Sequence, residues 1–137
     1  MVPKRSSSRV LVIDDSESAR LAIRAELSGA GFDVYSLPSA IGATRMLVRR
    51  SIDAVVIDLG MPGLSGDLLV GLLRRNPRLR SLVIVVVSGE REEELERVAR
   101  EIDVDAVLAK DRIPMELSGL IAELLRSRRL GTVVRSS

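Results

Sequence analysis

Hydrophobic and polar positions alternate with two different periods along the chain. Five short segments are rich in β-branched residues, and three of them are almost continuously apolar, as strands covered on both faces are. These segments are 9–14, 32–37, 53–58, 82–87 and 105–110. Segments of helical length separate or follow them, namely 16–30, 38–50, 65–75, 90–101 and 114–127. The alternation predicts an α/β fold with a parallel sheet and helices on both faces.

The expected helices differ in how much apolar surface they carry. The segment 38–50 has a weak apolar stripe that includes Ile41 and Val48, whereas 90–101 is polar except along one narrow edge that includes Val98. Since a helix is held mainly by its apolar face, we expect 90–101 to lie at the surface with few anchoring contacts.

Composition narrows the chemistry that the chain can perform. With 137 residues, 46% hydrophobic and 29% charged, the chain suits one globular domain. It contains no cysteine and no histidine, which excludes disulfides, thiolate zinc sites, cysteine nucleophiles and a histidine base. Carboxylates, hydroxyls, lysine and arginine remain. A metal site would therefore use oxygen ligands, which suit magnesium or calcium.

Charge and hydropathy indicate where the protein acts. The longest apolar runs, such as 82–87, are much shorter than the roughly 20 residues that span a bilayer. No signal peptide precedes Asp14 and Asp15, so we expect a cytoplasmic protein without membrane contacts. The net charge is +2, and basic residues gather in 4–9 and 126–135. We interpret these ends as solvated tails and do not expect nucleic acid as a partner of this chain alone.

Polar side chains follow four of the five predicted strands. Asp14 and Asp15 end the first, Asp58 the third, Ser88 the fourth and Lys110 the fifth. A single aspartate such as Asp58 could simply cap a turn. However, the carboxyl ends of parallel strands share one edge of the sheet, where ligand sites form, so these side chains should lie together.

Three carboxylates in one place repel one another and raise one another's pKa unless a cation lies among them. Magnesium is such a cation, since it takes carboxylate, carbonyl and water oxygens. A lysine and a hydroxyl beside the metal would form a pocket for a small oxyanion such as a phosphoryl group.

The order of these residues resembles the receiver domain of bacterial two-component response regulators. The resemblance covers about residues 8–126 and includes the aspartate pair, the motif "DLGMPGLSG", and the Ser and Lys that close the last two strands. It implies a doubly wound, flavodoxin-like sheet in the order 2-1-3-4-5 with five helices. It also implies a receiver domain at 9–127, between a flexible tail at 1–8 and a basic tail or linker at 128–137.

The resemblance further implies the chemistry of the site. Asp58 would accept a phosphoryl group from the phosphohistidine of a sensor histidine kinase or phosphotransfer protein, as a carboxylate nucleophile. Asp14, Asp15, Asp58 and the backbone carbonyl of Gly60 would hold Mg²⁺. Output would pass through contacts with a downstream protein target.

Four further positions are implied to contact or tune the phosphoryl group. Ser88 would donate a hydrogen bond to it and Lys110 would neutralise its oxygens. Glu90 lies where the family places a side chain that tunes rates, although a carboxylate there also suits the start of a helix. Val107 occupies the position at which receivers usually carry the Tyr or Phe of a conformational switch.

Two other departures from the family pattern bear on the site. Gly60 supplies no side chain beside the pocket, which should leave the pocket open to water. Asp111 follows Lys110 where many receivers have proline in a cis peptide, so this bond is either trans or strained.

Alternative functions follow from the departures and from the fold class. Val107 favours a pseudo-receiver, in which the same fold is a constitutive protein-interaction module, whereas the complete set of polar residues favours phosphorylation. A nucleotide- or flavin-binding domain is disfavoured because no Gly-x-Gly-x-x-Gly or P-loop run follows the first strand. An aspartate phosphatase would normally show Asp-x-Asp, which "DLG" does not provide.

Overall fold

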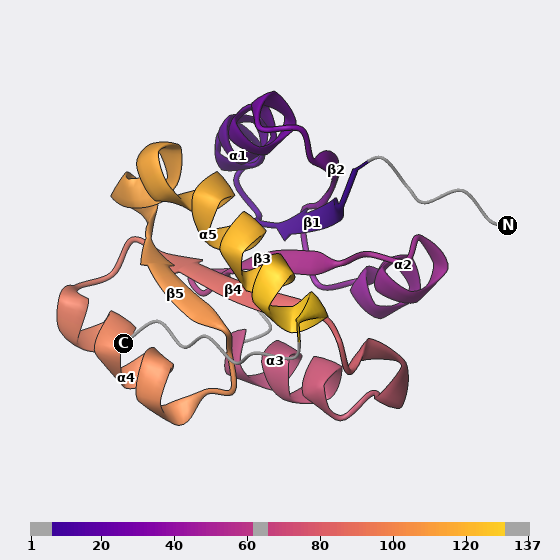
Figure 1. Ribbon diagram of the computed structural model, residues 1–137. Helices are drawn as coiled ribbons and strands as arrows, with labels where there is room; N and C mark the ends of the chain where they lie inside the picture. Colours follow the sequence, from indigo (N-terminus) through magenta and orange to yellow (C-terminus); the bar gives the residue numbers. More distant parts are fainter. Residues whose placement is uncertain (1–6, 62–65, 131–137) are drawn as a thin grey trace, which may run out of the picture.

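A computed structural model describes residues 7–61 and 66–130 of the chain (Figure 1). Its sheet has five parallel strands in the order β2-β1-β3-β4-β5, which confirms the predicted doubly wound architecture. The strands are β1 (Arg9–Ile13), β2 (Asp33–Leu37), β3 (Ala54–Asp58), β4 (Val83–Ser88) and β5 (Ala106–Ala109). The helices are α1 (Glu17–Gly29), α2 (Ala43–Arg49), α3 (Gly66–Arg74), α4 (Glu92–Glu101) and α5 (Ile113–Arg129), with 3₁₀ turns η1 (Pro77–Leu79) and η2 (Lys110–Arg112).

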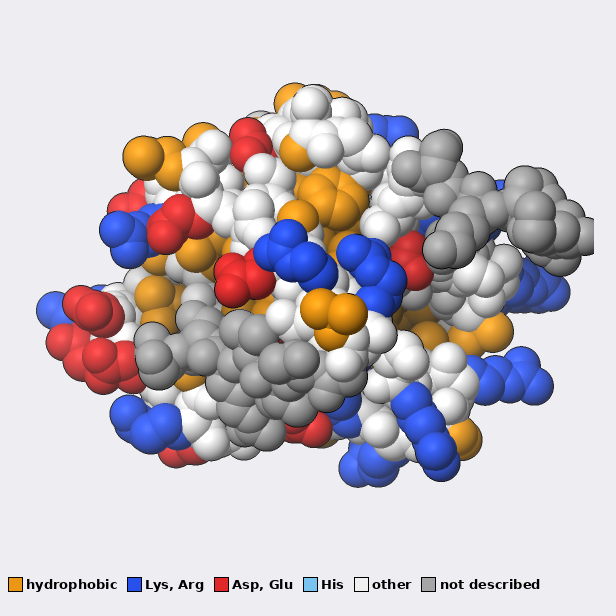
Figure 2. Space-filling view, in the orientation of Figure 1, with side chains coloured by type: hydrophobic (Ala, Val, Ile, Leu, Met, Phe, Trp, Pro, Cys, Tyr) orange, Lys and Arg blue, Asp and Glu red, His pale blue; other side chains and the backbone are white. Residues whose placement is uncertain are grey.

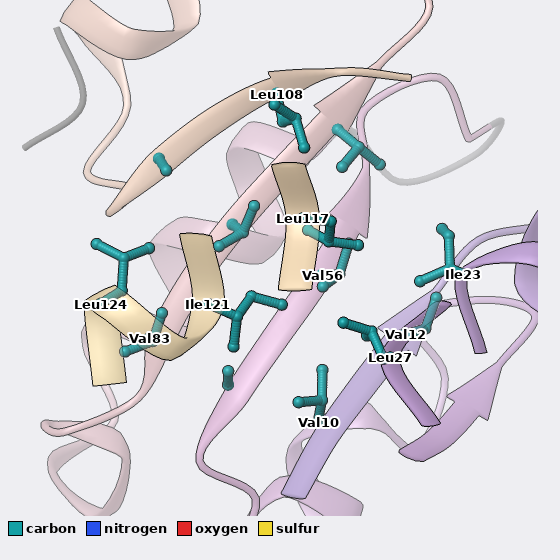
Figure 3. Packing of buried hydrophobic residues seen from close by; sticks show 14 of the residues in the cluster. Val10, Val12, Ile23, Leu27, Val56, Val83, Leu108, Leu117, Ile121 and Leu124 are labelled. Carbon is teal, nitrogen blue, oxygen red and sulfur yellow. The ribbon is translucent and has the colours of Figure 1, made fainter. Parts of the chain in front are cut away.

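Each face of the sheet has its own core, because successive strand residues point to opposite sides. On one face, Val10 and Val12 of β1 pack with the buried stripes of α1 and α5 (Figure 3). On the other, Leu11 and Ile13 pack with α2, α3 and α4. The central strands are buried along their whole length, as their continuous apolar sequences predict.

The helix after β2 differs from the sequence prediction. We expected a helix over 38–50 with Ile41 on its apolar side, but α2 begins only at Ala43 and Ile41 is 86% exposed. The buried residues are Ala43 and Leu47, one turn apart. The late start follows from Gly42, which caps the helix with φ +81°, a left-handed conformation that interrupts any helix begun earlier.

Helix α4 is attached to the domain as its sequence predicts. Val98 is its one buried residue, whereas α5 buries Ile113, Leu117, Ile121, Leu124 and Leu125. Within α4, Arg97 forms ion pairs with Glu94 at 2.6 Å and Glu101 at 2.7 Å. The helix is therefore held together along its own length more than it is held to the sheet.

The amino-terminal edge of the sheet carries an ion network that the sequence did not suggest. The Asp105 carboxylate accepts a hydrogen bond from Ile84 N at 2.7 Å and pairs with Arg74 at 2.9 Å and with Arg128. Arg74 also donates to the Leu82 carbonyl at 3.0 Å. This network ties the ends of α3 and α5 to the starts of β4 and β5.

No helix within the described residues is long and apolar enough to cross a membrane.

Candidate functional site

The carboxyl edge of the sheet collects polar residues from four strands. Asp14 directly follows β1, Asp58 and Ser88 are the last residues of β3 and β4, and Lys110 directly follows β5. The register keeps these ends level, because Asp58 pairs with Val87 in the neighbouring strand and Ser88 with Ala109. The structure therefore brings to one edge the residues that the sequence placed at the strand ends.

Asp14, Asp58 and Lys110 form the centre of the site. The side chains of Asp14 and Asp58 are almost fully buried, while Lys110 is partly exposed. The Lys110 Nζ lies 3.2 Å from Asp58 Oδ2 and 3.4 Å from Asp14 Oδ2. One cation thus lies between two buried carboxylates, and compensates only half of their charge.

Backbone groups orient the two buried carboxylates. Asp14 Oδ1 accepts a hydrogen bond from Ser16 N at 2.9 Å, and Asp58 Oδ1 accepts one from Gly60 N at 3.0 Å. In each case the donor lies two residues later in the loop that leaves the strand. Both loops therefore fix one carboxylate oxygen and leave the other directed toward Lys110.

The arrangement fits a hard divalent cation. Carboxylate oxygens of Asp14, Asp15 and Asp58 lie within 4.8 Å of one another. Among the described residues, Asp14 Oδ2 is a buried side-chain oxygen that makes no hydrogen bond, and its ion pair with Lys110 is a loose 3.4 Å. Buried acceptors without a hydrogen bond are rare. Asp15 is exposed, so the cluster opens to water on that side, as magnesium with its retained water ligands requires.

Burial and neighbouring charges set the ionisation of the site. Burial raises the pKa of Asp14, and repulsion from Asp58 adds to this, while the Ser16 hydrogen bond and Lys110 act in the opposite direction. For Lys110, burial alone would lower the pKa, but contacts with Asp58 and Asp14 outweigh it and raise the pKa. Lys110 is therefore a fixed positive charge at neutral pH and not a proton donor.

Ser88 and Glu90 link the site to the start of α4. Ser88 is buried, and its Oγ accepts a hydrogen bond from Glu90 N at 3.0 Å, which leaves the hydroxyl hydrogen available to a ligand. Glu90 is exposed and precedes α4 by two residues, so it is not a first-turn carboxylate of that helix. It lines a hollow of about 450 Å³ together with Leu59, Gly60 and Arg91.

Gly60 and Val107 each leave space beside the site. A Cβ added at Gly60 would lie 3.5 Å from Asp58 Oδ1, which is ordinary van der Waals contact, so a side chain would fit there beside the carboxylate. Val107 is half-buried on β5 and lines a second hollow, of about 840 Å³, between α4 and β5. The described residues include no cis peptide bond, so the Lys110–Asp111 bond is trans.

Ser16 and Arg20 are site residues that the sequence reasoning did not identify. Besides its bond to Asp14, Ser16 caps α1 by accepting from Ala19 N at 3.2 Å. Arg20 donates to the Asp14 carbonyl at 2.7 Å. The sequence feature that could have identified them is a serine suited to an N-cap directly after the aspartate pair, with an arginine four residues later. Together they hold the loop that presents Asp14 and Asp15.

The arrangement of strands and polar ends is matched by known proteins. Residues 10–122 match the response regulator receiver domain family. The chain belongs to this family. Receiver domains act in two-component signal transduction controlled by phosphorylation, and they bind Mg²⁺ at an acidic pocket.

Individual relatives of this receiver domain agree with the assignment. The sensory/regulatory protein RpfC of Xanthomonas campestris is 32% identical over 125 residues, which is 90% of this chain. These residues span 17% of the length of that relative. A receiver domain from Methylobacillus flagellatus is 28% identical with a TM-score of 0.72 over 87% of this chain and 99% of its own. The chemotaxis response regulator CheY4 of Vibrio cholerae, 22% identical, shares the fold with a TM-score of 0.77 over 87% and 99% of the two chains.

Proposed function

We propose that this receiver domain accepts a phosphoryl group on Asp58 from the phosphohistidine of a sensor histidine kinase or phosphotransfer protein, with Mg²⁺ held by Asp14, Asp15, Asp58 and the Gly60 carbonyl. The observation that carries the proposal is the position of Asp58. Its carboxylate lies at the rigid end of a buried strand, 3.2 Å from the Lys110 ammonium and within 4.8 Å of two further carboxylates.

The transfer needs one bond to form and one to break. An Asp58 carboxylate oxygen attacks phosphorus, and the bond from phosphorus to the donor's imidazole nitrogen breaks, with its electron pair leaving on that nitrogen. Phosphoryl transfer requires mainly positioning and compensation of negative charge. When bound, Mg²⁺ supplies part of this compensation, since it draws the carboxylates together and neutralises phosphoryl oxygens.

The protein's own residues supply the remainder. Lys110 remains charged and lies beside the oxygen that faces the pocket, so it would pair with the incoming phosphoryl group. The hydroxyl of Ser88 would donate to a phosphoryl oxygen while its Oγ keeps the bond from Glu90 N. The gap at Gly60 would let water reach the acyl phosphate, and Glu90 at its rim would tune the hydrolysis that ends the signal.

A constitutive protein-interaction module is the second candidate function, and Val107 is the observation that favours it. A valine has one stiff rotamer preference and leaves the hollow beside β5 unfilled, so it cannot switch as an aromatic ring does. In either case the output would pass through contacts with a downstream protein.

Intact-protein mass spectrometry after incubation with acetyl phosphate and magnesium separates the two functions. A phosphorylated receiver gains one phosphoryl group, which is lost when EDTA replaces magnesium during the incubation. Asp58→Asn should gain none, because an amide is a far poorer nucleophile than a carboxylate. Asp103→Asn, at an exposed position, is the matched control and should react like the wild type. An unmodified wild-type protein would support the interaction module, and modification of Asp58→Asn would point to another acceptor.

A further inference from the structure

Helices α2, α3 and α4 form one outer face of the molecule, and the charges on this face are separated. Residues 34–52 and 68–89 contain no acidic residue, but hold three and four arginines respectively. The two stretches meet in space, because α2 packs beside η1. Six of these arginines are exposed: Arg45, Arg49, Arg50, Arg75, Arg78 and Arg80. Figure 2 shows the resulting basic patch as blue side chains on the α2 side of the molecule.

The opposite side of the same face is acidic. Residues 90–105, which include α4, contain eight acidic residues and three arginines. Glu92, Glu93 and Glu96 are exposed, and no ion pair joins any of them to another described residue. Red side chains gather over α4 in Figure 2, at the end of the molecule away from the blue patch.

Apolar residues lie between the two charged regions. Leu68 and Leu72 of α3 are 59% and 53% exposed and lie one turn apart on the same side of the helix. Gly71 adjoins them and presents no side chain, so a facing helix can approach closely there. The face thus has an apolar centre between a basic and an acidic side.

We propose that this face binds a second copy of the chain through a two-fold axis that passes near Leu72. A two-fold contact is self-complementary, since each feature meets its counterpart on the other copy. The axis places α3 against α3 and sets the basic patch of each copy over α4 of the other. Leucines then form the dry centre and ion pairs form the rim, as in protein interfaces generally.

The positions of the charges along the helices fit the same symmetry. Each helix starts at the carboxyl edge of the sheet and runs to the other edge, so Arg49, Arg50 and η1 lie far from the carboxyl edge. Glu92, Glu93 and Glu96 lie close to it. A two-fold axis that lies in the plane of the interface, at right angles to the line from the basic patch to the start of α4, places these two regions of the two copies opposite each other. This axis therefore brings the end of α2 over the start of α4.

A second copy matches this face better than a polyanion does. Nucleic acid or an anionic membrane would attract the arginines, but the acidic side of the same face would repel it. Such a partner would also leave the leucines of α3 uncovered. Only a partner with the reverse order of charges and an apolar centre covers the whole face, and the chain itself is such a partner.

Sedimentation of the unphosphorylated chain over a range of concentrations tests the proposal. At low ionic strength we expect a reversible dimer and no larger species, because a two-fold contact is closed. Dimerisation should weaken as salt screens the rim. Arg45→Glu with Arg49→Glu, and separately Glu93→Arg with Glu96→Arg, should each raise the dimer dissociation constant at least about tenfold by placing like charges opposite each other.

Mixing the two charge-reversed variants tests most directly whether the basic patch of one copy faces α4 of the other. An equimolar mixture should form a heterodimer with wild-type affinity, because opposite charges then face each other at both ends. Arg24→Glu with Arg126→Glu, on α1 and α5 of the other face, is the control and should leave dimerisation unchanged. Leu72→Glu, at an exposed position that should not affect folding, should abolish the dimer.

A wild-type chain that stays monomeric at millimolar concentration and low salt overturns the proposal. A dimer that withstands both charge reversals overturns it as well. A monomer that binds heparin through Arg45 and Arg49 would show that the patch serves a polyanion and would equally overturn the proposal.

Discussion

Both edges of the sheet carry aspartates with little exposure to water, partly buried at the amino-terminal edge and buried at the carboxyl edge, but the surroundings of these aspartates differ. At the amino-terminal edge, Asp105 receives a backbone hydrogen bond and pairs with two arginines. At the carboxyl edge, Asp14 and Asp58 share one lysine, and Asp14 Oδ2 makes no hydrogen bond. A carboxylate whose charge is fully compensated serves the fold, whereas carboxylates held together with too little positive charge are prepared for a cationic ligand.

Asp105→Ala should have the largest effect on stability. It removes the common partner of Arg74 and Ile84 N, so that a partly buried guanidinium loses its nearest carboxylate and a backbone donor is left without an acceptor. We expect a loss of about 3 kcal/mol in the free energy of unfolding, measured by urea denaturation. Asp103→Ala, with an exposed side chain, should cost less than about 0.5 kcal/mol. Equal losses in both variants would show that the network does not support the fold.

Magnesium should stabilise the carboxyl edge only while its ligands are complete. The folded state alone gathers the three carboxylates, so a concentration of ten times Kd should add about 1.4 kcal/mol to the free energy of unfolding. Asp15→Asn should remove this gain, as followed by thermal denaturation with and without magnesium. Asp33→Asn, an exposed aspartate beside Arg9, is the control. An equal magnesium response in Asp15→Asn and the wild type would contradict the assigned ligands.

Asp14→Asn should stabilise the metal-free protein at neutral pH by about 1 kcal/mol, the usual penalty of a poorly compensated buried polar group. Because burial raises the pKa of Asp14 above its ordinary 3.8, the folded state binds this proton more tightly than the unfolded state does. The wild type therefore loses stability as pH rises from about 3.8 through the raised pKa. Urea denaturation in EDTA across this range should show the advantage of the asparagine variant growing with pH. If the extra stability of Asp14→Asn stayed constant with pH, it would come from packing and not from the charge of Asp14.

The smallest expected effect concerns how phosphorylation changes the surface. With Val107 in place of a ring, we expect the change to pass through Ser88 and the loop at Glu90 into α4, with little effect on β5. Hydrogen exchange with and without beryllofluoride, a phosphoryl mimic, should show differences confined to residues 88–100. Equally large differences around Val107 would contradict this route, and no difference anywhere would favour the constitutive module.

Sequence reasoning succeeded where structure depends on local pattern or on strand polarity. Continuous apolar runs predicted the strands, and a parallel sheet necessarily collects their carboxyl ends, so Asp14, Asp58, Ser88 and Lys110 could be placed together. The predicted start of α2 was wrong, because the apolar pattern in the sequence extended back to Ile41 whereas the left-handed backbone of Gly42 prevents a helix from passing through it.

Long-range ion pairs could not be predicted in the same way. Asp105 stands 31 residues from Arg74 and 23 from Arg128 in sequence, and no local period relates them. Their meeting depends on where the ends of α3 and α5 lie over the sheet, which only the packed structure determines.

The attachment of α4 has a mechanical consequence. Its ion pairs join Arg97 to residues of the same helix, and Val98 alone is buried beneath it. The helix should therefore keep its own structure while its position on the sheet changes easily. A sideways or tilting displacement alters the packing around Val98 and leaves the ion pairs within the helix intact. Motion of this kind would leave the far-ultraviolet circular dichroism unchanged, so its detection needs a distance probe between α4 and the sheet. The distance between a spectroscopic probe at Arg100 and a second probe on the sheet would change with such a displacement.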